Sequence, residues 1–264
     1  MDIDLVWLPL TEHAAAMQGI TDGLARMRAQ IEQRLRCRVR PRANSAGIPT
    51  GLAIERAQVR IKIDVTPVLR GAVFEPERRI MQPAAQQAFG FLEMQTLGFA
   101  DVYAGKLVAA LDRQHPRDLF DVMHLLASEG LNDELWSAFL VYLVSHNRPA
   151  AELLNPRRKD LAIAHAAEFA GMTMEPVTLT ELEKAREDLI ARLHERLDEP
   201  ACAFLLAMER ETLDWSTLRL PAHVANLPAV RWKLHNLARR TPIKREADYR
   251  QLLQVLERIG RGET

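Results

Sequence analysis

The chain has 264 residues, of which 48% are hydrophobic and 27% are charged. These values are typical of a globular protein and exclude a disordered or fibrous chain. The 35 basic and 35 acidic residues cancel, so the net charge by itself predicts no polyanionic partner. No apolar run reaches the roughly 18 to 20 residues of a membrane span. Cys37 and Cys202 fit no metal or CxxC spacing, so we expect free thiols in a cytoplasmic protein. The lack of a long apolar run predicts no membrane contact.

The first hundred residues combine short strands with one long helix. Apolar residues predict a strand over 3–7 and, at three- and four-residue intervals, a helix over 20–35. Proline, glycine, asparagine and serine predict a loop over 40–51. Residues 52–55 and 59–65 predict a hairpin, because apolar and charged residues alternate along the second segment.

After about residue 99 the apolar residues recur at helical spacing to the end of the chain. We therefore expect an α+β protein, with an α/β domain over 1–113 and a helical domain over 114–264. The expected helices cover residues 102–111, 117–127, 132–144, 160–169, 179–197, 202–213 and 249–259.

Charge is distributed unevenly along the chain. Segment 26–42 contains seven arginines and one acid, segment 231–261 contains nine basic residues and three acids, and segment 181–199 is acidic. If the two basic segments share a face, they would attract a polyanion such as RNA. The alternative is that each is an ordinary solvated helix face.

Three carboxylates form the first chemical signal. Asp2 and Asp4 are two apart in a predicted strand, so both side chains are expected on one face, and Asp64 lies on the polar face of the predicted strand 59–65. Carboxylates this close repel unless a cation lies between them. Mg²⁺ tolerates one or two carboxylates together with substrate phosphates. The three residues are therefore candidate metal ligands for phosphoryl or nucleotidyl transfer, although each one alone is more often a solvated surface residue.

The second signal lies between residues 106 and 121. Lys106 and Arg113 are seven apart and share a helix face, from which both could reach a triphosphate. Asp118 and Asp121 are three apart at the start of the next helix. The alternative, which the spacing alone favours, is ordinary capping with an Arg117–Asp121 ion pair at i, i+4.

Taken together, these residues resemble the nucleotidyltransferase toxins of the AbiEii/AbiGii family. The matching pieces are Asp2-Ile3-Asp4-Leu5, Lys62-Ile63-Asp64-Val65-Thr66-Pro67, and Tyr103-Ala104-Gly105-Lys106 running through Arg113 to Arg117-Asp118-Leu119-Phe120-Asp121. The last of these three pieces is the most specific to the family. The resemblance covers roughly residues 1–130.

The resemblance implies a polymerase-β-like nucleotidyltransferase domain followed by a helical C-terminal domain. It further implies a toxin of a toxin–antitoxin or abortive-infection pair whose partner is a winged-helix antitoxin. The implied reaction transfers a nucleotide from an NTP to an RNA acceptor, in some members the 3′ end of tRNA. By position in the motifs, Asp2 and Asp4 would hold Mg²⁺, and Asp64 would complete the acidic triad and help activate the acceptor hydroxyl.

The same resemblance assigns roles to the second signal. Lys106 would hold the triphosphate, and Asp118 would orient the nucleotide or the acceptor as a catalytic residue. Arg113, Arg117 and Asp121 would support the nucleotide-binding cleft.

The family pattern begins with a helix and a Gly-Gly or Gly-Ser turn before the first acidic strand, whereas here Met1 directly precedes Asp2. We therefore expect an N-terminally truncated nucleotidyltransferase domain without that turn, whose backbone N–H groups bind nucleotide phosphates. A late start codon, a fragment and a family member that has lost activity remain open as explanations. The alternative function is a catalytically degenerate binding or regulatory protein on the same scaffold.

Overall fold

The computed structural model describes residues 2–65, 71–218 and 220–263. Contacts between residues divide the chain into two units, each described by itself below. Unit 1 contains Met1–Ala72 and Asn226–Arg231, and unit 2 contains Val73–Ala225 and Trp232–Thr264. The expected α+β class is confirmed. The polymerase-β-like fold and the domain boundary at residue 113 stay predictions.

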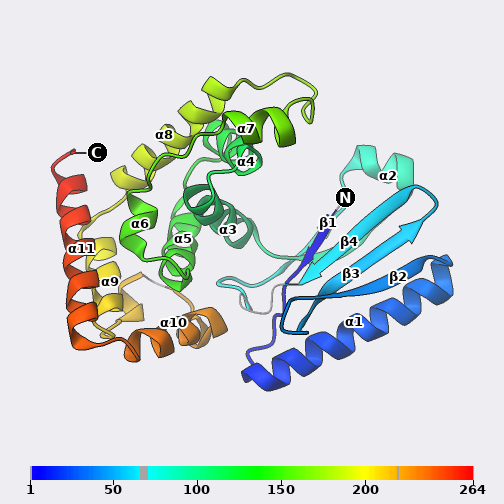
Figure 1. Cartoon of the computed structure of the whole chain (residues 1–264), viewed down its shortest axis with the longest axis horizontal. Helices are drawn as coiled ribbons and strands as arrows, with labels where there is room; N and C mark the ends of the chain where they lie inside the picture. Colours follow the sequence, from blue (N-terminus) through cyan, green and yellow to red (C-terminus); the bar gives the residue numbers. More distant parts are fainter. Residues whose placement is uncertain (1, 66–70, 219, 264) are drawn as a thin grey trace. The chain divides into compact units, whose positions relative to one another are not determined.

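Unit 1 is a four-stranded sheet with one long helix on one face (Figure 1). The strands lie in the order β1-β4-β3-β2, with β1 parallel to β4 and the other two pairings antiparallel. The helix α1 (His13–Leu35) buries Ile20 and Leu24 against the apolar side chains of the sheet. The strands are β1 (Asp2–Leu5), β2 (Arg38–Ala43), β3 (Pro49–Arg56) and β4 (Val59–Val65).

Strand β4 shows why the sheet has two different faces. Ile63 and Val65 are buried in the cluster under α1, whereas Lys62 and Asp64 alternate with them and point to the opposite face. The predicted hairpin of β3 and β4 is confirmed. It closes over residues 57–58, and Ala57 adopts a positive φ of 51° there.

The predicted loop over residues 40–51 is wrong at both ends. Residues 38–43 form β2, which pairs with β3, and β3 already begins at Pro49. Pro41 lies in β2, where it is tolerated because this strand is at the edge of the sheet. Pairing with β3 therefore overrides the local turn preference of the proline- and glycine-containing segment.

Unit 2 is mainly helical, apart from a two-stranded ribbon of β5 and β6. Its central helix, α5, packs against α3 and places Phe139, Leu140 and Leu143 in the core, each with no exposed surface. The remaining elements, in chain order, are β5 (Glu77–Ile80), α2 (Pro83–Phe89), β6 (Glu93–Thr96), α3 (Phe99–Asp112), α4 (Pro116–Ala127), α5 (Asp133–Ser145), α6 (Ala150–Leu154), α7 (Ala162–Ala164), a π-helical turn (His165–Phe169), α8 (Leu179–Glu195), α9 (Glu199–Glu209), two 3₁₀ turns (Trp215–Leu218 and Ala222–Asn226), α10 (Pro228–Ala238) and α11 (Pro242–Gly260).

The seven expected helices all find a counterpart, although segment 160–169 ends as the π-helical turn. The elements β5, α2, β6, α6 and α10 were not expected, because they are short or lack a regular apolar stripe. Cys37 and Cys202 are free thiols, as predicted. Within the described ranges, no helix combines the length and apolar character needed to cross a membrane.

Candidate functional site

Asp4 and Asp64 lie side by side on neighbouring parallel strands. The register of β1 and β4 pairs Asp4 with Asp64 directly, and adjacent strands are about 4.8 Å apart. Both side chains leave the sheet on the face opposite α1, because Ile3 and Ile63, their neighbours in sequence, belong to the cluster under α1. The expected approach of these two carboxylates is therefore present in the backbone register.

Asp64 has an ion-pair partner that the sequence analysis did not consider. Arg42 on β2 donates from Nη1 to Asp64 Oδ1. The two side chains are 37% and 35% exposed, so water reaches the pair. Asp4 is exposed at the end of the same row of residues.

Asp2 pairs with Lys62 in the strand register, but its side chain lies outside the described part of the structure. The predicted triad is therefore represented by the pair Asp4 and Asp64. Among the described residues, no group of three or more histidine, cysteine, aspartate or glutamate side chains is arranged to hold a metal ion. Two carboxylates on one strand row nevertheless fit Mg²⁺, which needs only one or two carboxylates when substrate phosphates complete its shell.

The second group of predicted residues lies at the corner between α3 and α4 in unit 2. Lys106 Nζ donates to Asp121 Oδ2 at 2.5 Å. Arg113 donates from Nε and Nη2 to the two oxygens of Asp118, at 2.5 and 2.7 Å. Two ion pairs therefore join the end of α3 to the first two turns of α4.

These two pairs differ in exposure. The side chains of Lys106 and Asp121 are both 38% exposed, whereas the Asp118 side chain is only 8% exposed under Arg113. The bond to Asp118 raises the pKa of Arg113 above its usual value. Lys106 and Asp121 are therefore open to a ligand from solvent, and Asp118 reaches one only if Arg113 moves.

The Arg117–Asp121 pair, which spacing alone favoured, does not form. Arg117 donates from Nε and Nη2 to the backbone oxygen of Glu168, at 3.3 and 3.2 Å, and Asp121 is held by Lys106. The expected capping is present, because the ring of His115 accepts from the backbone N–H of Arg117 and Pro116 begins α4.

In the second basic segment, 231–261, several charged side chains are buried or paired within the protein. Lys233 is 5% exposed and donates to the backbone oxygen of His146 at 2.6 Å. Arg240 and Lys244 both bind Asp248, at 2.7 Å each, and Arg240 also lies 3.3 Å from Glu209. Burial lowers the pKa of Lys233 and raises that of Glu209. These cations are paired within the protein, so this part of the segment does not support RNA binding, and the buried Lys233 does not fit a solvated helix face either.

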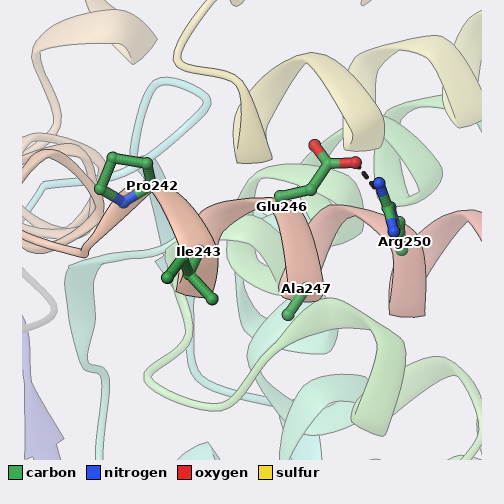
Figure 2. Close-up of a pocket in the computed structure, with 5 residues that line it drawn as sticks. All are labelled: Pro242, Ile243, Glu246, Ala247 and Arg250. Carbon is green, nitrogen blue, oxygen red and sulfur yellow. Dashed lines mark hydrogen bonds and ion pairs between the residues drawn. The ribbon is translucent and has the colours of Figure 1, made fainter.

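Two surface hollows of the described residues are lined by none of the predicted site residues. One is a shallow hollow on α11, lined by Pro242, Ile243, Glu246, Ala247 and Arg250 (Figure 2). Glu246 and Arg250 close an ion pair across it at 2.6 Å. A single helix lines this hollow, so it cannot enclose a ligand as a site does. A second hollow lies between α4 and α8.

The residue that the sequence analysis missed at this site is Arg42, together with Gly51 beside it. The signal was available: Arg38, Arg40 and Arg42 alternate with Val39 and Pro41, a period-two pattern typical of a strand. The turn-forming residues that follow favoured a loop over this strand pattern. Because β2 was not predicted, Arg42 could not be placed next to Asp64 from the sequence.

The comparison with family models identifies residues 1–236 as matching the model described as "Nucleotidyl transferase AbiEii toxin, Type IV TA system". No curated protein and no solved structure gives a match to this chain. The matched range extends well beyond the roughly 130 residues that carry the motifs and includes most of the helical part. Membership implies a nucleotidyltransferase toxin and an antitoxin partner. The chain belongs to the AbiEii family of nucleotidyl transferase toxins of type IV toxin–antitoxin systems.

Proposed function

We propose that this chain is a Mg²⁺-dependent nucleotidyltransferase toxin that transfers a nucleotide from an NTP to an RNA acceptor, the 3′ end of tRNA, in the cytoplasm. A winged-helix antitoxin is the proposed partner. The observation that carries the proposal is the direct pairing of Asp4 and Asp64 on the face of the sheet opposite α1. Family membership supplies the reaction class.

Within this proposal, Asp4 and Asp64 hold the metal, with Asp2 as a third ligand. A bound Mg²⁺ would neutralise charge on the phosphate oxygens during transfer. Asp64 also accepts the proton of the acceptor hydroxyl, which makes that oxygen the better nucleophile. Acceptor contact is supported by the arginines of β2, since Arg38 and Arg40 are exposed and alternate along the same strand as Arg42.

The α3–α4 corner supplies the nucleotide contacts. Lys106 holds the triphosphate as a point charge, and to do so it exchanges Asp121 for phosphate oxygens. Arg113 and Arg117 add guanidinium donors for the nucleotide phosphates, and Asp118 orients the nucleotide through Arg113. The partial exposure of the Lys106–Asp121 pair supports this exchange, because an ion pair in contact with water is weak.

The direct test incubates the protein with each α-³²P-labelled NTP, Mg²⁺ and total tRNA, and follows label transfer to RNA on a denaturing gel. We expect transfer from wild type and a loss of at least about 100-fold in Asp4→Asn and Asp64→Asn, since both remove negative charge from the metal site. Asp22→Asn is the matched control, because Asp22 is exposed on α1, where it accepts a hydrogen bond from Gln18.

Lys106→Gln tests the second group of residues in the same assay. Lys184→Gln is its matched control, since Lys184 also pairs with an aspartate at 2.5 Å on a unit 2 helix. We expect Lys106→Gln to lose transfer and Lys184→Gln to keep it. Transfer that persists at the wild-type rate in Asp4→Asn or Lys106→Gln would remove the assignment.

One observation favours the alternative function, a binding or regulatory protein on the same scaffold that has lost catalytic activity. Asp64, Lys106 and Asp118 each already have an ion-pair partner within the chain, as expected of a scaffold that needs no ligand. This alternative predicts RNA binding that weakens steeply with salt and no label transfer with any NTP. Salt-dependent binding without transfer in the assay above would therefore decide for it.

A further inference from the structure

One row of residues crosses all four strands of the sheet in unit 1. Asp4 on β1 pairs with Asp64 on β4, Asp64 pairs with Gly51 on β3, and Gly51 pairs with Arg42 on β2. Two negative charges and one positive charge therefore lie in a line, with a glycine between Asp64 and Arg42.

Gly51 lies between Arg42 and Asp64 in this row and pairs closely with β4. Its φ is 154°, and a Cβ at this position would lie 2.0 Å from the backbone oxygen of Ile63, a distance that real side chains do not reach. A residue with a side chain here would displace β4. The glycine therefore keeps β3 and β4 in close register, and the Arg42 side chain reaches Asp64 across two strand spacings of about 4.8 Å each.

The contact places Arg42 in competition with a metal ion. A guanidinium and a divalent cation both bind carboxylate oxygens, and they repel one another at short range. Because the pair of Arg42 and Asp64 is about one third exposed, it is weak enough for an ion to displace it.

We propose that Arg42 is a positioning residue that occupies Asp64 when no metal is bound and is displaced when a divalent cation enters. Arg42 thereby sets the metal concentration at which the carboxylate site fills. The inference rests on the proposed function, because it takes Asp4 and Asp64 as the metal ligands. Within the row of Asp4, Asp64, Gly51 and Arg42, the positive charge is that of Arg42, whereas Lys62 lies on the same face in a neighbouring row.

Arg40 is the matched control. It lies on the same strand and face, two residues from Arg42, but its partner in the register is Ala53 and its ion-pair contact is Glu55 at 3.8 Å. Glutamine at either position keeps a long polar side chain and removes one positive charge. A difference between Arg42→Gln and Arg40→Gln therefore reports contact with Asp64 and not the loss of charge in general.

The experiment titrates the full chain with Mn²⁺, following the free-ion signal by electron paramagnetic resonance. We expect Arg42→Gln to bind Mn²⁺ about 2- to 5-fold more tightly than wild type, the range expected from an exposed ion pair, and Arg40→Gln to bind within about 1.5-fold of wild type. In an Asp64→Asn background, Arg42→Gln should have no effect. Circular dichroism at matched concentration shows that each variant is folded.

The outcomes separate the inference from the proposed function. If wild type binds Mn²⁺ through Asp4 and Asp64 and Arg42→Gln binds no more tightly, the role of Arg42 is overturned and the metal site stands. If neither wild type nor Arg42→Gln binds Mn²⁺, the metal site itself is overturned. In the transfer assay, the Mg²⁺ concentration for half-maximal activity should fall in Arg42→Gln by the same factor as the Mn²⁺ dissociation constant.

Discussion

At the scale of single residues, several buried polar side chains organise the backbone around them. Asp101 on α3 is 1% exposed and accepts the backbone N–H groups of Val73 and Phe74 at 2.8 and 2.9 Å. Tyr142 donates its hydroxyl to the same carboxylate at 3.0 Å. Burial raises the pKa of Asp101, although these three bonds oppose the shift. One carboxylate thus ties the first residues of unit 2 to α3 and α5.

Asp101→Asn is expected to lower the free energy of unfolding by about 2 kcal/mol. An amide has one acceptor oxygen, so one of the two backbone N–H groups loses its partner, and an unpaired buried donor costs about 1–3 kcal/mol. Urea unfolding followed by circular dichroism measures the change. The exposed Asp22→Asn serves as the control and should stay within about 0.5 kcal/mol of wild type. Equal stabilities of the two variants would contradict the role given to Asp101.

His194 on α8 predicts a loss of stability in mild acid. Its Nε2 donates to the backbone oxygen of Leu154 at 2.7 Å, and its buried Nδ1 has no hydrogen-bond partner among the described residues. Burial, together with the charge of Arg158, lowers the pKa of His194, while the bond to Leu154 opposes this. The unfolded chain therefore takes up the proton more readily than the folded chain.

The stability that His194 contributes is complete above its unfolded pKa of about 6.5 and is lost as the pH falls towards the lowered folded value. The free energy of unfolding should therefore decrease between pH 7.5 and 5.5. His194→Gln should flatten this slope. His146, whose pKa burial also lowers, retains part of the slope. A slope that is identical in wild type and His194→Gln would refute the prediction.

At the scale of elements, local sequence signals decide where helices begin. Thr178 caps α8 by accepting the backbone N–H of Glu181, and the Glu181 side chain accepts the backbone N–H of Thr178 in return. The same helix buries Leu182, Leu189 and Leu193, so its start is fixed by the cap and its orientation by the apolar face.

Thr178→Ala should lower the free energy of unfolding by about 1 kcal/mol, the usual effect of losing a threonine cap. Thr180 is exposed two residues further along the helix, so Thr180→Ala is the control and should be neutral or slightly stabilising, since alanine has the higher helix propensity. Thermal or urea denaturation of both variants makes the comparison. A larger loss in Thr180→Ala than in Thr178→Ala would exclude the capping role.

At the scale of the whole molecule, each of the two units has buried apolar side chains of its own among the described residues. Ile20 belongs to the cluster between α1 and the sheet of unit 1, and Ile190 is buried in α8 of unit 2. Basic and acidic residues cancel over the chain, and ion pairs such as Arg42–Asp64 in unit 1 and Arg113–Asp118 in unit 2 form within one unit. The stability of the molecule should therefore be close to a sum over two independent cores.

A double-mutant cycle tests this independence. Ile20→Val and Ile190→Val should each cost about 1 kcal/mol, and the double variant should cost the sum within about 0.5 kcal/mol, because the two residues share no core. Ile20→Val with Ile63→Val is the comparison, since these residues lie in one cluster and their effects need not add. Strong coupling between Ile20 and Ile190 would contradict the division into two cores.

The elements that sequence reasoning predicted are those whose pattern is local and regular. The alternation along residues 59–65 and the three- to four-residue spacing in α3, α4, α5, α8 and α11 each depend only on which residues repeat. Strand β2 was missed because the turn preference of 40–51 is also local and pointed the other way. The motifs of the family are local as well, so the family was recognisable in the chain, and the match over residues 1–236 confirms the family.

The sequence by itself therefore determined the family and the α+β class. It also predicted that Asp4 and Asp64 would lie side by side if their strands were neighbours, which the pairing of β1 with β4 shows. The ion-pair partners of the candidate site residues were decided only by the tertiary structure: Arg42 for Asp64, Lys106 for Asp121, and Arg113 for Asp118. The physical reason is distance along the chain. A periodic pattern is set by near neighbours, whereas an ion pair forms between whichever side chains the packing of strands and helices brings together.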